Sequence, residues 1–169
     1  MALQQINVGH VPEQDRLLVR ISTTDKLEFR FWLTRHLLRG LWAGLLQRMQ
    51  STEPVRQQAA PQTRAAVLGF QHEKALSESR FGDPYLKDEL TPAIPGEPLL
   101  IASINLSEGG KGQHVLVFLP KTGAGITVQV NDRMLHAFAK LVDEAAQRAG
   151  WDLALSVPVG APAAGTTVN

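Results

Sequence analysis

Histidine is the residue type of this chain best suited to metal binding or proton transfer. The five histidines are His10, His36, His72, His114 and His136. None has a second ligand-type residue at a spacing typical of a metal site, and His72 lacks the second histidine of a metalloprotease helix. The spacing therefore predicts solvated or hydrogen-bonded histidines and no bound metal.

Two glycine-rich segments have the composition of phosphate-binding loops, at residues 109–112 (GGKG) and 121–125 (KTGAG). Phosphate binding requires such a loop to lead from a strand into the N-terminus of a helix. Both segments instead connect two strand-like patterns, where glycine supplies the positive φ angles of tight turns. We therefore expect two hairpin turns and no cofactor.

Side chains for nucleophilic or acid–base catalysis are not gathered in the sequence. The chain has no cysteine, and no serine lies in a Gly-x-Ser-x-Gly elbow. The carboxylate pairs at 88–89 and 143–144 fall in a polar loop and late in a helical pattern, where a solvated surface is the usual setting. The sequence predicts no catalytic residues and favours a binding protein over an enzyme, although a pocket formed by distant residues stays open as an alternative.

The composition is that of an ordinary globular protein, with 44% hydrophobic and 20% charged residues in a chain of 169. The net charge is +1, so the molecule as a whole does not attract nucleic acid or anionic lipid. No apolar stretch approaches the roughly 20 residues that cross a bilayer, and the N-terminus lacks a signal-peptide pattern. With the absence of cysteine, these features predict a cytoplasmic protein without membrane contact.

Alternation of apolar and polar residues predicts five strands. Those at 17–22 and 27–33 are joined by a short turn into a hairpin. Those at 99–106, 114–119 and 126–130 follow one another closely and predict an antiparallel three-stranded meander.

Helical periodicity predicts helices at 35–49, 61–79 and 132–149. Because the strands are grouped apart from the helices, we expect an α+β fold, with an antiparallel sheet (hairpin plus three-stranded meander) packed with about three helices. The predicted organisation is a flexible N-terminal arm over 1–15, a single domain over 16–157 and a disordered tail over 158–169.

The first predicted helix has an apolar stripe wider than packing on a small sheet requires. Thr34 is suited to cap it, and Gly40 and Gly44 lie four residues apart, where they let another backbone approach closely. Two alternatives remain open: the stripe binds a second copy or a partner protein, or it fills an intramolecular core. The candidate interface residues are Leu37, Leu38, Leu41, Trp42, Leu45 and Met49.

The outward face of the first hairpin combines arginines with an exposed tryptophan and continues into the helix. Such a face holds phosphates and stacks bases in proteins that bind single-stranded nucleic acid. The alternative is that the tryptophan is covered and the arginines extend around it. The candidate nucleic-acid contacts are Arg20, Arg30, Trp32, Arg35 and Arg39.

These features together favour a non-catalytic protein-interaction or assembly module that self-associates through the amphipathic helix. The alternative function is a single-stranded nucleic-acid-binding module that uses the hairpin face with Arg20, Arg30 and Trp32. The expected partner is therefore a second copy or another protein, and nucleic acid is the less favoured partner.

Overall fold

The computed structural model of the chain describes residues 2–80, 83–86 and 89–158. These residues form seven strands in one mixed, mostly antiparallel sheet and four helices, which confirms the α+β class. The strands are β1 (Leu3–Val11), β2 (Arg16–Thr23), β3 (Leu27–Leu33), β4 (Thr91–Pro92), β5 (Leu99–Gly110), β6 (Gln113–Pro120) and β7 (Ile126–Asn131). The helices are α1 (Arg35–Gln50), α2 (Glu53–Arg56), α3 (Pro61–Ser77) and α4 (Asp132–Arg148).

The first antiparallel set contains β1, β2 and β3, and β1 is an addition to the predicted hairpin. It lies within residues 1–15, where a flexible arm was expected. Ile6 and Val8 of β1 pair with Ile21 and Val19, which are buried, so this apolar edge of β2 is covered by a third strand. The expected tail at 158–169 lies outside the described residues except for Pro158.

The second antiparallel set contains β5, β6 and β7 and confirms the predicted meander. The two sets meet where β5 runs parallel to β3, with Phe31 opposite Leu99 and Trp32 opposite Leu100. β4 also pairs parallel with β3. The predicted sheet is antiparallel throughout, so these parallel contacts are a correction. They arise because the long helical connection after β3 lets the chain return and run in the same direction as β3, with β4 beside its first residues and β5 beside its last.

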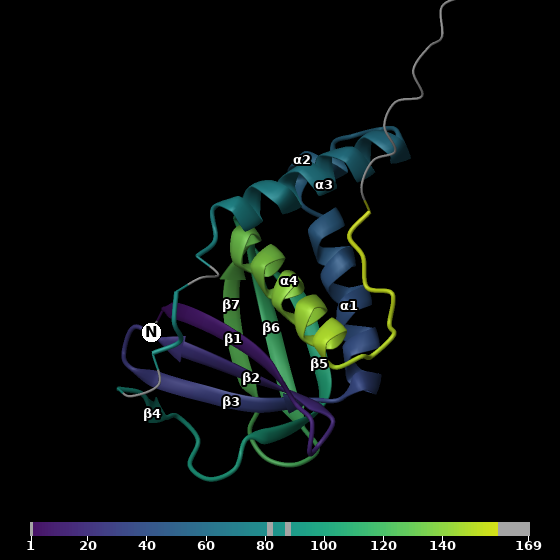
Figure 1. Ribbon diagram of the computed structural model, residues 1–169. Helices are drawn as coiled ribbons and strands as arrows, with labels where there is room; N and C mark the ends of the chain where they lie inside the picture. The colour runs from purple at the N-terminus through teal and green to yellow at the C-terminus, as the bar shows by residue number, and fades with distance from the viewer. Residues whose placement is uncertain (1, 81–82, 87–88, 159–169) are drawn as a thin grey trace, which may run out of the picture.

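The three predicted helices are present, and α2 is an additional short one. α1 is capped by Thr34, whose side chain accepts a hydrogen bond from the Leu37 amide, and α4 is capped by Asn131 in the same way. Figure 1 shows the two strand sets crossing steeply, α1 and α4 lying side by side against the second set, and α3 running across their ends.

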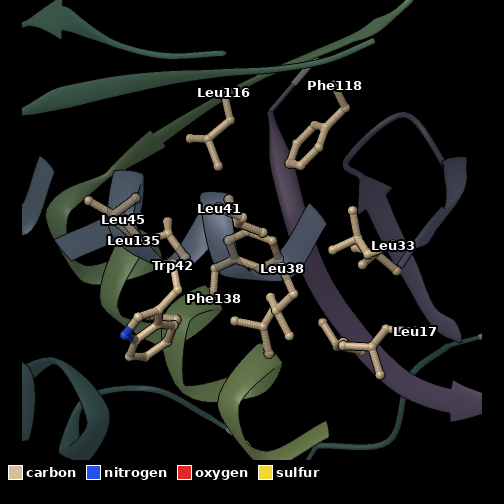
Figure 2. Close-up of a cluster of buried hydrophobic side chains, with 14 of the residues drawn as sticks. Leu17, Leu33, Leu38, Leu41, Trp42, Leu45, Leu116, Phe118, Leu135 and Phe138 are labelled. Carbon is tan, nitrogen blue, oxygen red and sulfur yellow. The ribbon is translucent and has the colours of Figure 1, made fainter. Parts of the chain in front are cut away.

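The core lies where α1 and α4 meet the inner faces of both strand sets (Figure 2). Phe31 of β3 and Phe118 of β6 stack across the two sets with ring centroids 4.4 Å apart. Burying a large apolar side chain contributes about 1.5–3 kcal/mol, so this cluster is the main source of stability. The labelled members are Leu17, Leu33, Leu38, Leu41, Trp42, Leu45, Leu116, Phe118, Leu135 and Phe138.

Candidate functional site

The apolar stripe of α1 faces the core of its own chain. Trp42 is the most exposed of the buried candidate interface residues, and only 7% of its surface is accessible. Leu37 is half-buried. The stripe is wide because it packs against α4 as well as the sheet, so the intramolecular alternative accounts for it. The buried members are Leu38, Leu41, Trp42, Leu45 and Met49.

The candidate nucleic-acid residues of the first hairpin come together but lie under another part of the chain. Arg20 is directly opposite Arg30, and Leu18 is opposite Trp32. Trp32 is only 9% exposed, which corrects the expectation of an exposed ring. The Arg30 guanidinium donates a hydrogen bond to the backbone carbonyl of Gly96 at 2.8 Å, which shows that the segment before β5 crosses this face.

Further polar contacts hold this covering segment in place. The Tyr85 hydroxyl donates to the Glu28 carboxylate at 3.0 Å, and burial together with this carboxylate raises the pKa of Tyr85. The backbone amide of Ala93 donates to the carbonyl of Glu28. Stacking of a base on Trp32 would therefore require this segment to move away. The other two candidate contacts, Arg35 and Arg39, are exposed on α1.

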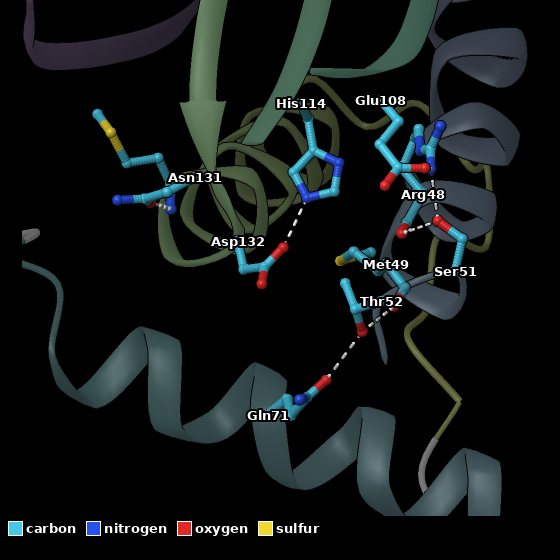
Figure 3. A network of polar contacts seen from close by, with 10 residues as sticks. Arg48, Met49, Ser51, Thr52, Gln71, Glu108, His114, Asn131 and Asp132 are labelled. Carbon is cyan, nitrogen blue, oxygen red and sulfur yellow. Dashed lines mark hydrogen bonds and ion pairs between the residues drawn. The ribbon is translucent and has the colours of Figure 1, made fainter. Parts of the chain in front are cut away.

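Three of the five histidines converge with one aspartate, in what we call the histidine cluster: His72, His114, Asp132 and His136. The Nδ1 atoms of His72 on α3 and His136 on α4 are 2.9 Å apart. Nε2 of His114 on β6 lies 2.6 Å from a carboxylate oxygen of Asp132 (Figure 3). His114 and His136 are both buried. No sequence pattern indicates this cluster, because its members come from three separate elements.

Burial controls the charge of the His72–His136 pair. It is the main cause that lowers the pKa of His72, and it lowers the pKa of His136 to about 4 with a further contribution from His72. Both rings are therefore uncharged at neutral pH, and one Nδ1–H donates to the other Nδ1. A proton added to either ring would be placed in a buried site with another histidine beside it.

The contacts of the histidine cluster join α3 to α4 and α4 to β6. Within the described ranges no group of three or more ligand-type side chains is arranged to hold a metal ion. Neighbouring contacts extend the polar region: the Thr52 hydroxyl is 3.3 Å from the Gln71 side-chain oxygen, and Arg48 lies 3.9 Å from Glu108 (Figure 3). The region therefore ties α3 to α1, α4 and the second strand set.

A groove of about 510 Å³ lies between β1 and the first half of α4, with the segment after α3 as its outer wall. Gln5 fixes that wall, because its side chain donates to the carbonyl of Pro84 and accepts from the amide of Leu86. The lining combines apolar residues with two arginines and two acidic residues. The lining includes Ile6, Arg80, Arg133, Met134, Ala137 and Leu141.

The second exposed feature is the edge of β5. This strand leaves β3 after Leu100, and from there to Gly110 it pairs only with β6 among the described residues. On its outer face Ser103, Asn105 and Ser107 are exposed and uncharged. The structure thus places open backbone groups beside small polar side chains.

The sequence matches no protein-family model, and no curated protein or solved structure matches it either. None of the described helices has the length and apolar character needed to cross a membrane. The interpretation of function therefore depends on the surfaces described above.

Proposed function

We propose that this chain is a non-catalytic assembly module, and that it self-associates by pairing the open edge of β5 with β5 of a second copy. The proposal is supported by one observation above all. β3 pairs with β5 only at Leu99 and Leu100, and then turns away into α1, so the rest of β5 has one strand neighbour within the described chain. An unpaired edge presents free N–H and C=O groups to which another strand can add.

Between residues 103 and 108 the open edge lacks the lysine, proline and bulges that usually prevent strand addition. Register shifts occur between Ile101 and Ser103 and between Glu108 and Gly110, so the segment 103–108 between them is regular. This segment contains neither lysine nor proline, and its single charge is Glu108.

Antiparallel self-pairing about Asn105 brings no like charges together. Around this centre Ser103 lies opposite Ser107 of the second copy, and Glu108 lies opposite Ala102. Arg48 of the same chain is already within 3.9 Å of Glu108. A two-fold axis at Asn105 would therefore satisfy both edges with identical contacts and close the assembly at two copies.

α1 borders the open edge with small residues. A Cβ atom at Gly44 would lie 3.1 Å from a Leu106 methyl carbon, so this turn of α1 lies against β5. One turn earlier, Gly40 has open space around it, and Ala43 is exposed. Small residues let two helices approach closely, so the α1 helices of two copies can flank the paired strands. This flank of α1 is separate from the buried leucine stripe.

Light scattering coupled to size-exclusion chromatography tests the proposal. The native protein should have twice the monomer mass of 18.5 kDa. Asn105→Lys should give the monomer, because like charges directly opposite each other destabilise a strand pair. The matched control is Gln129→Lys, on the exposed outer face of β7, which should leave the mass unchanged. A native monomer at about 100 µM, or a dimer that Asn105→Lys does not affect, would contradict the proposal.

The absence of cysteine allows a test of the register. In an antiparallel pair the Cα atoms of opposite residues are about 4.5–5.5 Å apart, within the range that a disulfide spans. Asn105→Cys should therefore form a covalent dimer on mild oxidation, whereas Gln129→Cys should not. Efficient cross-linking through position 129 and none through 105 would place the interface elsewhere.

A further inference from the structure

Helix α3 is attached to the rest of the fold by few apolar contacts. Of its 17 residues only Leu68, Gly69 and Ala75 are buried, and Leu68 is the one large apolar side chain among them. Phe70, the aromatic residue of this helix, is 68% exposed. Figure 1 shows that α3 lies across the ends of α1 and α4 rather than along them. Because hydrophobic burial is the main force that holds packed elements together, α3 depends strongly on its polar contacts.

Two side-chain contacts join α3 to neighbouring helical segments in the part of the chain that the structure describes. The first is the His72–His136 pair, with 2.9 Å between the Nδ1 atoms. The second is the 3.3 Å contact of the Gln71 side-chain oxygen with the Thr52 hydroxyl, just after α1 (Figure 3). A hydrogen bond between two Nδ1 atoms requires one of them to lack a hydrogen. Protonation of the accepting ring therefore turns the first contact into two N–H groups that face each other.

The charges around His72 act in opposite directions. Lys140 of α4 disfavours a proton on this ring, whereas Asp143 of α4 and Glu73 of α3 favour one. Asp143 accepts a hydrogen bond from the Gln147 side chain at 2.9 Å, and Glu73 is exposed. Burial is the largest cause of the lowered pKa of His72. Movement of α3 away from α4 removes this burial, and His72 then accepts a proton more readily.

His136 is the more deeply buried ring, with 2% of its surface exposed. Burial and His72 are the two causes that lower its pKa most, His114 of β6 adds to the lowering, and Asp132 of α4 opposes it. The Asp132 carboxylate already lies 2.6 Å from Nε2 of His114. Separation of α3 from α4 exposes the His136 ring and takes His72 away, so it removes both of the main causes.

We infer that α3 is a pH-sensitive element of the fold: proton uptake by the His72–His136 pair separates α3 from α4, while the sheet, α1 and α4 stay folded. α1 and α4 keep the core contacts that they make with the sheet, among them those of Leu38 and Phe138 (Figure 2). Buried histidines act in this way in proteins that respond to a pH between about 5 and 6. The inference is independent of the proposed self-association, because neither α3 nor the histidine pair takes part in the pairing of β5.

Hydrogen exchange followed by mass spectrometry tests the inference on the full native chain at about pH 7.5 and pH 5. After correction for the intrinsic pH dependence of exchange, protection of the α3 amides should fall by about tenfold or more on acidification. A change in the pKa of His136 from about 4 to 6.5 sets the upper limit at about thirtyfold. Amides of β6 should stay better protected than those of α3 at both pH values. Low concentrations of urea should speed exchange in β6, which requires global unfolding, more than exchange in α3, which requires only local opening.

A double variant, His72→Asn with His136→Asn, removes both titrating rings and keeps polar groups near the Nδ1 positions. Its α3 protection should change by less than about twofold between the two pH values. His36→Asn, at an exposed position of α1, should behave like the native protein.

Three results would overturn the inference. The first is native α3 protection that does not fall at pH 5, and the second is α3 and β6 exchanging with equal protection and equal urea dependence. The third is a double variant that loses α3 protection as the native protein does. The comparison of α3 with β6 uses the native chain alone, so it decides the matter even if the double variant does not fold.

Discussion

Acidification should destabilise the fold through the His72–His136 pair. The pKa of His136 is lowered from 6.5 to about 4, first by burial and then by the charge of His72, while Asp132 opposes the shift and His114 adds to it. For His72, burial is followed by Lys140 as a cause that lowers the pKa, while Asp143 and Glu73 raise it. Because the native pKa values are depressed, the unfolded chain takes up protons at a higher pH than the native protein.

The sign and size of the effect follow from this difference. Above the unfolded pKa of 6.5, the depressed pKa of His136 does not reduce the free energy of unfolding. That free energy falls as the pH drops from 6.5 towards the native pKa of about 4. At 1.36 kcal/mol per pKa unit, the total is at most about 3 kcal/mol, of which about 2 kcal/mol is lost by about pH 5. That loss is a large fraction of the stability of a small domain.

Urea unfolding followed by tryptophan fluorescence measures this loss. Trp32, Trp42 and Trp151 are all buried, so unfolding will change their emission. His136→Asn retains a hydrogen-bonding group near the Nδ1 position but does not titrate. The free energy of unfolding of the native protein should fall between about pH 7.5 and pH 5 by about 2 kcal/mol more than that of the variant.

His36→Asn is the matched control, because His36 is exposed on α1. Its pH dependence should equal that of the native protein. If His136→Asn loses as much stability between neutral and acidic pH as the native protein does, the buried histidine pair is not the source of the acid sensitivity, and the argument from its burial is refuted.

Three further predictions concern the core and the turns. Leu38→Ala, at a fully buried position, should lower the free energy of unfolding by about 2–5 kcal/mol in urea titrations. Trp151→Phe removes the indole donor that is 2.7 Å from the Asp15 carboxylate and is the largest cause of the lowered pKa of Asp15, so an NMR titration should show that this pKa rises. Gly125→Ala should lower the melting temperature, because its Cβ would lie 2.7 Å from the backbone oxygen of Phe118, a contact too short to relax without moving the chain.

Local pattern was sufficient to predict most elements of this fold but not how the strands meet. Five strands and three helices have clear periodicity, and the structure contains them all. β1 is less obvious because Gln4, Gln5 and Asn7 are polar, and the alternation of Ile6 and Val8 is short. The parallel contact of β3 with β5 involves two residue pairs that are far apart in sequence, so no local pattern encodes it.

Site residues were harder to predict because the parts of the chain that cover a given side chain are determined by the tertiary structure. The helical spacing of Leu38 and Trp42 identifies an apolar face, but only the positions of α4 and the sheet show what covers it. The pattern of β3 places Trp32 on the outward face, and that face is crossed by a segment held through the contact between Arg30 and Gly96, 66 residues later. The histidine cluster is formed across 64 residues between His72 and His136.

The open edge of β5 follows from the way the two strand sets meet, and the groups beside it determine how the proposed assembly would close. Because the two antiparallel strand sets share only a two-residue contact, β5 keeps an open edge inside the sheet, while β1 and β7 are the end strands. If β5 of one copy paired with β1 of the next, every copy would retain an open edge and the assembly would grow into a fibre. α4 and the wall fixed by Gln5 narrow the approach to β1, and a β5 strand carries α1 beside it. Addition of a β5 strand with its flanking α1 to β1 is therefore disfavoured, and the proposed pairing of β5 with another β5 would close the assembly at two copies.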